Sequence, residues 1–185
     1  VISQNINDNK SGAFTGEVSI DMLKSIGINT TLIGHSERRA IYNEDDVLLF
    51  KKINIALKSN MDIIFCFGEE LKDRKSNSHF DVVKSQLDNT VMKLESSSWK
   101  NIVLAYEPVC AIGSGLIPKP QDLCKTVEFI KSKFKDKLPK ILYGGSVNPQ
   151  NITILREINN IDGFLIGGAS QNAKKFIDIV KKTYS

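Results

Sequence analysis

The chain has 185 residues, of which 41% are hydrophobic and 25% are charged. This composition excludes disordered and collagen-like classes, and the length suits one domain, residues 1–185, with one sizeable core better than two domains. The net charge of +4 comes mostly from lysines that are not interleaved with aromatic residues, so we expect no nucleic-acid site.

Cysteine and histidine usage bears on the compartment and on metal binding. The three cysteines, Cys66, Cys110 and Cys124, form no C-x-x-C pair and leave an odd count, which favours a reducing compartment such as the cytoplasm. With two histidines a zinc site would be hard to assemble, so no metal is expected. No apolar run is long enough to cross a bilayer, and a targeting sequence upstream of Val1 would not be visible in this chain.

Strand and helix patterns alternate along the whole chain. Short apolar runs typical of parallel strands occur six times, at residues 1–5, 29–33, 61–67, 101–106, 141–143 and 163–166. Capped or amphipathic segments predict helices between and after them, at residues 19–26, 43–60, 79–95, 120–134, 148–158 and 172–182. The alternation predicts an α/β fold whose parallel sheet is either open or closed into a barrel.

Every conspicuous polar motif follows a predicted strand, so all of them are expected on one rim of the sheet. Glu107 follows the run at 101–106 and precedes Pro108. Partial burial at that position would raise the pKa of the carboxyl group toward that of a useful general base. The alternative interpretation is an ordinary strand-to-helix turn with a solvated glutamate.

Glycines mark three candidate anion-binding corners. They are Gly113, the run Gly144-Gly145-Ser146, and the pair Gly167-Gly168. Bare backbone N–H groups with a serine hydroxyl can cradle a phosphate without a lysine. A single Gly-Gly pair usually marks only a turn, but the three corners together match the phosphate site expected after the last two strands of an eight-stranded α/β barrel.

His35 also follows a strand, and the dipole of the helix start after it would keep its imidazole neutral. A lone histidine is more often a satisfied core or rim residue. However, one carboxylate and one neutral imidazole beside a phosphate cradle are what proton transfer next to a carbonyl requires. His35 and Glu107 are therefore the candidate catalytic pair.

Several segments resemble triosephosphate isomerases: QN with GAFTGEVS within 4–19, GHSERR at 34–39, AYEPVCAIGSG at 105–115, YGGSV at 143–147 and DGFLIGGAS at 162–170. The resemblance implies an eight-stranded (β/α)8 TIM barrel, usually a homodimer. Such enzymes of glycolysis and gluconeogenesis interconvert dihydroxyacetone phosphate and D-glyceraldehyde 3-phosphate through an enediolate, without a cofactor. The family is the usual worked example of a glutamate base paired with a neutral histidine.

The matching motifs carry the family's roles to particular residues. By this resemblance Glu107 would remove the substrate carbon proton, and His35 would polarise the carbonyl and shuttle protons. The remaining assignments are phosphate contacts at Gly113, Ser146, Gly167 and Gly168, supporting positions at Glu37 and Cys66, and a loop reaching the partner subunit at Thr15 and Glu17.

The chain also departs from the family. Its residues match about six of the family's eight strand-helix units. The first two units, which carry the family's substrate-contacting Asn and Lys, have no match in this sequence. This predicts a C-terminal portion of a longer isomerase, with little or no activity of its own. Cys110 replaces a Trp at the leading hinge of the flap, and Leu116-Ile117-Pro118 replaces a more polar trailing hinge, which would alter flap closure.

Two other functions are compatible with these motifs. A catalytically silent paralogue or fragment acting as a dimer-interaction module would keep the fold without the chemistry. Another phosphate-binding barrel enzyme, such as a sugar-phosphate epimerase, is disfavoured because it would need different acids at the strand ends and often a metal.

Overall fold

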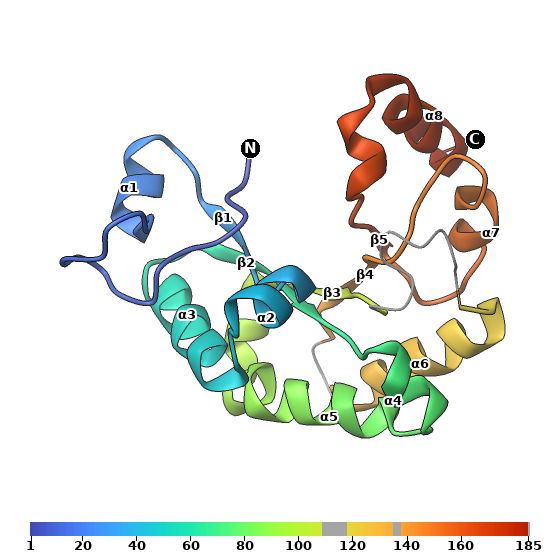
Figure 1. Ribbon diagram of the computed structural model, residues 1–185, viewed down its shortest axis with the longest axis horizontal. Coiled ribbons are helices and arrows are strands. Elements are labelled where there is room, and N and C mark those ends of the chain that lie inside the picture. Colours follow the sequence, from blue (N-terminus) through green and yellow to red (C-terminus); the bar gives the residue numbers. More distant parts are fainter. Residues whose placement is uncertain (109–117, 135–137, 185) are drawn as a thin grey trace.

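The computed structural model describes residues 1–108, 118–134 and 138–184 (Figure 1). These residues form one sheet in which each strand pairs in parallel with the next, in the order β1-β2-β3-β4-β5. The strands are β1 Thr30–Ile33, β2 Asp62–Phe67, β3 Ile102–Tyr106, β4 Lys140–Tyr143 and β5 Gly163–Phe164. The predicted α/β class is confirmed, and the strand order follows the chain order as in a barrel.

Helices connect the strands and cover the sheet. They are α1 Ile20–Ser25, α2 Ser36–Tyr42, α3 Asp46–Lys58, α4 Leu71–Lys75, α5 His79–Asn89, α6 Pro120–Ser132, α7 Ile152–Arg156 and α8 Ala173–Tyr184. In Figure 1, α3, α5 and α6 lie along one side of the sheet, whereas α1 and the pair α7 and α8 lie at opposite ends of the molecule. None of the helices in the described ranges is long and apolar enough to cross a membrane.

Local signals set several helix boundaries as predicted. The hydroxyl of Ser19 accepts a hydrogen bond from the N–H of Met22 and caps α1. Gly27, which follows α1, has a φ of +79°, a conformation that glycine adopts without strain. Pro120 occupies the first turn of α6, where its missing N–H is not needed.

Other predicted boundaries are wrong. Residues 1–5 form no strand but one isolated bridge, in which Ser3 pairs with Thr31. The last predicted strand is reduced to the two residues of β5. The helix predicted over 79–95 ends at Asn89, because Thr90 leaves helical geometry with φ −127° and ψ −94°.

The helix start expected after His35 is present, but the extent of α2 was not predicted. The short helix α4 was not predicted, and α7 begins later than predicted. The side chain of Asn148 accepts hydrogen bonds from the N–H groups of Gln150 and Asn151. This turn uses the residues that were expected to form the first helical turn, and the helix therefore starts at Ile152.

The two faces of the sheet carry different clusters. Alternate residues of β2 and β3 point toward α3, α5 and α6 and form the centre of one continuous core, which includes Ile63, Phe65, Phe67, Leu104 and Tyr106. On the opposite face, Leu32, Cys66 and Ala105 form a smaller buried cluster. Because side chains alternate along a strand, Glu107 continues the face of Ala105, away from the helix-covered core.

A buried polar network ties the end of β3 to α4 and α6. The guanidinium of Arg74 donates to the Glu69 carboxylate at 2.6 Å and to the Tyr106 hydroxyl at 2.7 Å. The same guanidinium donates to Thr126 at 3.3 Å, and the Tyr106 hydroxyl donates to Glu69 at 3.0 Å. Each of these buried groups therefore has a partner, as buried polar groups require.

We expect Tyr106→Phe to lower the free energy of unfolding by about 1–3 kcal/mol, because it removes a hydroxyl on which a buried carboxylate and a guanidinium both depend. Chemical denaturation measures the change. The control is Tyr42→Phe on α2, since the Tyr42 side chain is largely exposed. Equal stabilities of the two variants would show that the network does not stabilise the fold.

Candidate active site

His35 stands at the junction between β1 and α2. It is the N-cap of α2, and its Nδ1 accepts a hydrogen bond at 3.3 Å from the N–H of Glu37. In the neutral ring, an Nδ1 that accepts leaves the proton on Nε2. Nε2 lies 3.5 Å from Oε1 of Glu107, so the strand ends bring the two predicted catalytic side chains together.

Glu107 follows β3 directly and is only 1% exposed. Its Oε2 accepts a hydrogen bond at 3.1 Å from the N–H of Ser36. Burial raises the pKa of this carboxyl, and the neighbouring His35, the Ser36 N–H and the Cys66 thiol offset part of the rise. The site therefore holds a carboxylate that is more basic than a solvated glutamate.

Cys66 lies behind the carboxylate, in the small cluster on this face of the sheet. Burial raises the pKa of the thiol, and the negative charge of Glu107 raises it further. The thiol therefore stays protonated and supports Glu107 as a neutral neighbour.

One cavity of about 420 Å³ contains both members of the catalytic pair and two of the glycine corners. Its lining includes His35, Glu107, the segment Gly144–Ser146 and the pair Gly167 and Gly168. A side chain at Gly167 or Gly168 would meet no atom within 4 Å, so the backbone there faces open space. The third corner, Gly113, lies outside the described residues, as do Cys110, Leu116 and Ile117.

The two glycine corners offer unused donors. Between described residues, no hydrogen bond involves the N–H groups of Ser146, Gly167 or Gly168. The Ser146 peptide is held in place by Asn151, whose side chain donates to the Ser146 carbonyl at 2.8 Å. Free N–H groups at fixed positions suit a small anion.

The other predicted site residues are distributed between two places. Glu37 lines the same cavity, with a largely exposed side chain whose Oε2 lies 3.8 Å from Nδ1 of His35. Thr15 and Glu17 lie on the loop over residues 6–17, in its exposed part from residue 10 onward, and do not line this cavity. Glu17 accepts a hydrogen bond from Asn7 at 3.2 Å and lines a separate cavity of about 510 Å³ with Phe14.

Sequence reasoning missed two groups at the site. Ser36 contributes its backbone N–H to Glu107, which the sequence could have indicated because residues that start a helix have free N–H groups. Lys175, in the first turn of α8, lines the cavity and adds a positive charge. No motif marks this lysine among its neighbours. Within the described ranges, no group of three or more His, Cys, Asp and Glu side chains is placed to hold a metal ion.

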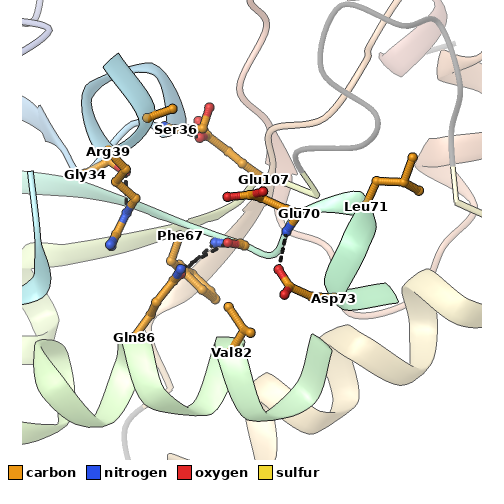
Figure 2. A pocket seen from close by; sticks show the side chains of 12 residues that line it. Gly34, Ser36, Arg39, Phe67, Glu70, Leu71, Asp73, Val82, Gln86 and Glu107 are labelled. Carbon is orange, nitrogen blue, oxygen red and sulfur yellow. Dashed lines mark hydrogen bonds between the residues drawn. The ribbon is translucent and has the colours of Figure 1, made fainter. Parts of the chain in front are cut away.

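A second cavity of about 520 Å³ lies on another side of Glu107, between α2, the end of β2 and α5 (Figure 2). Arg39, Phe67, Glu70 and Gln86 are among its lining residues. Of these two cavities, as lined by described residues, the one of about 420 Å³ brings Glu107 together with His35 and two glycine corners, and we take it as the candidate active site.

The raised pKa of Glu107 has a consequence for stability. The folded state binds this proton more tightly than the unfolded state, so stability is lost as the pH rises from about 4.5 through the folded pKa. We expect Glu107→Gln to remove this contribution, so that the variant loses less stability than the parent between pH 4 and pH 7. Thermal unfolding at a series of pH values checks it, with Glu37→Gln, at an exposed carboxylate, as the control. Parallel curves for the parent and Glu107→Gln would contradict the assignment.

Comparison with known proteins agrees with this geometry. The family model described as triosephosphate isomerase matches residues 1–183. Triosephosphate isomerase of Flavobacterium johnsoniae is 48% identical, over 97% of this chain and 75% of the relative. Those of Flavobacterium psychrophilum and the yeast Yarrowia lipolytica are 46% and 41% identical, over 97% of this chain and 75% and 74% of the relatives. The chain belongs to the triosephosphate isomerase family.

Proposed function

We propose that this protein interconverts dihydroxyacetone phosphate and D-glyceraldehyde 3-phosphate, the reaction of the enzymes that it resembles. The observation that carries the proposal is one cavity that holds the buried carboxylate of Glu107, the Nε2 of His35 and two glycine corners. The N–H groups of these corners, at Ser146, Gly167 and Gly168, make no hydrogen bond to another described residue. A proton-transfer pair beside an anion site is the set of groups that this reaction needs.

The chemistry follows from the positions of the two side chains. The Glu107 carboxylate takes a proton from the carbon next to the carbonyl, and the C–H electron pair becomes the C=C bond of the enediolate. The Nε2–H of His35 hydrogen-bonds the carbonyl oxygen and stabilises the charge that gathers there. Proton transfer between the two oxygens, followed by return of the carbon proton from Glu107 to the neighbouring carbon, completes the isomerisation without a change of oxidation state overall.

The glycine corners would hold the phosphate. The N–H groups of Ser146, Gly167 and Gly168 are available to phosphate oxygens, and the cation of Lys175 would attract the dianion to the cavity. The family motif assigns Gly113 a further contact. Binding the phosphate fixes the carbons of the substrate between Glu107 and His35, so that the proton moves over a short distance.

The assembly and location are also proposed. Residues 1–185 would act as one domain, which is supported by the continuous hydrophobic core. The loop with Thr15 and Glu17 would join two copies into a homodimer, and Phe14 in this loop is 44% exposed and able to pack against a partner. The cytoplasm is the expected location, since Cys66 and Cys124 are free thiols.

We expect Glu107→Ala to reduce turnover by about 10²–10⁴-fold or more, because it removes the base that takes the carbon proton. His35→Gln should reduce turnover strongly as well, since it weakens stabilisation of the enediolate. A coupled assay of triose phosphate interconversion measures both, using the protein translated from its full reading frame.

The control for this assay is Lys51→Ala, at an exposed position of α3, which should leave turnover unchanged. Turnover of Glu107→Ala equal to that of the parent would remove Glu107 from the mechanism. An inactive parent protein that is folded would refute the proposed function and favour a silent paralogue.

A further inference from the structure

A side-chain amide on α5 pairs with both backbone polar groups of the residue that follows β2. Oε1 of Gln86 accepts a hydrogen bond at 2.9 Å from the N–H of Gly68, and Nε2 of Gln86 donates to the Gly68 carbonyl at 3.1 Å. Figure 2 shows Gln86 extending from α5 toward this turn, with the side chain of Glu107 on the opposite side of the strand end, near Ser36. Two bonds to one residue fix its orientation as well as its position, since rotation about one bond breaks the other.

Gly68 in turn lies directly against the backbone of Glu107. A Cβ atom at Gly68 would come within 1.8 Å of the Glu107 carbonyl oxygen and 2.5 Å of its carbonyl carbon. The preceding residue, Phe67, accepts a hydrogen bond from the Glu107 N–H at 2.8 Å. The turn Phe67–Gly68 therefore contacts both sides of the Glu107 α-carbon.

The side chain of Glu107 has equally little room. A Cβ atom at Gly144 would come within 2.9 Å of Cγ of Glu107. The side chain of Glu107 is thus held between Gly144, which follows β4, and the N–H of Ser36. A shift of the Glu107 backbone would displace the carboxylate relative to both residues. A displacement of about 1 Å at a reacting group can cost about 10²-fold in rate.

The geometry points to Gln86 as a positioning residue for Glu107. We propose that its double hydrogen bond holds Gly68 against the Glu107 backbone and so keeps the carboxylate in the orientation that reaches the substrate carbon. The inference rests on the proposed function for the role of Glu107, but the placement of the carboxylate can be tested without substrate.

Gln86 does not belong to the buried stripe of its helix. Val83 and Leu87 fill the core from α5, whereas Gln86 is half-buried and lines the second cavity beside Glu107. A methionine of similar length could occupy this space, so loss of the amide can be separated from loss of volume. Thr90 offers a matched control, because its buried hydroxyl donates to the backbone carbonyl of Gln86, and among the described residues it has no hydrogen bond to Gly68.

Several other charged or titratable groups surround the carboxylate and would influence its titration. His35 and Cys66 contact Glu107 directly. The groups that share a cavity with it are Arg39, Glu70 and Asp73 on one side and Glu37 and Lys175 on the other. Gln86→Met changes none of these groups, so a change in titration would report a change in the position or solvation of Glu107.

The experiment compares Gln86→Met with Thr90→Val in the protein translated from its full reading frame. We expect Gln86→Met to lower kcat by about 10–100-fold with KM within about twofold of the parent, because the phosphate corners are not altered. The pKa of Glu107, followed by carboxyl carbon NMR and assigned with Glu107→Gln, should fall as the carboxylate gains water. Thr90→Val should lower the melting temperature without changing kcat or this titration.

The outcomes separate the inference from the proposed function. If Gln86→Met loses stability as Thr90→Val does but keeps the parent's kcat and Glu107 titration, Gln86 is only a structural hydrogen-bonding residue and the inference is overturned. If the parent shows no isomerase activity, the proposed function fails, and the titration of Glu107 alone decides whether Gln86 positions the carboxylate. A change of the Glu107 pKa in Gln86→Met but not in Thr90→Val supports the inference, and an unchanged pKa in Gln86→Met refutes it.

Discussion

The structure depends on keeping one carboxylate, that of Glu107, out of water. Burying an ionisable carboxyl destabilises its charged form, and the cost is tolerable only where hydrogen bonds and nearby positive potential compensate. Here the compensating groups are the Ser36 N–H at a helix start, the imidazole of His35 and the thiol of Cys66. The balance leaves a glutamate whose pKa is raised, which is the property that a base acting on a carbon acid requires.

Close packing of backbone explains why this environment can exist. Three glycines, Gly34, Gly68 and Gly144, lie where a Cβ atom would come within 3 Å of Cys66 or Glu107. Gly34 also has a φ of +85°, which turns the chain from β1 toward His35. The parallel sheet places the ends of successive strands side by side, and the missing side chains then allow the strand ends to converge on the carboxylate.

Much of this arrangement could be predicted because it follows from alternation and strand-end position. The apolar runs predicted β1 to β4 closely. The motifs after them placed His35, Glu107 and two of the three glycine corners at one cavity, whereas the third, Gly113, lies outside the described residues. A helix start after His35 was expected, but the extent of α2 was missed. A histidine is not a typical N-cap, and its capping bond depends on a ring nitrogen that a sequence pattern does not reveal. Gln86 was missed because its hydrogen-bond partner is the backbone of Gly68, on another element of the chain. The strand predicted at residues 1–5 is reduced to one bridge because a strand needs pairing along its length as well as β-propensity.

In the proposed reaction, the carboxylate of Glu107 and the phosphate of the substrate would lie at opposite ends of the same cavity. Glu107 lies at the end of β3, the N–H groups of Gly167 and Gly168 follow β5, and β4 lies between β3 and β5. These two N–H groups make no hydrogen bond within the described part of the chain. A dianion bound at the glycine corner would add negative potential at Glu107 and make the base stronger when substrate is present. Substrate binding at the glycine corner would therefore strengthen the carboxylate that acts on it.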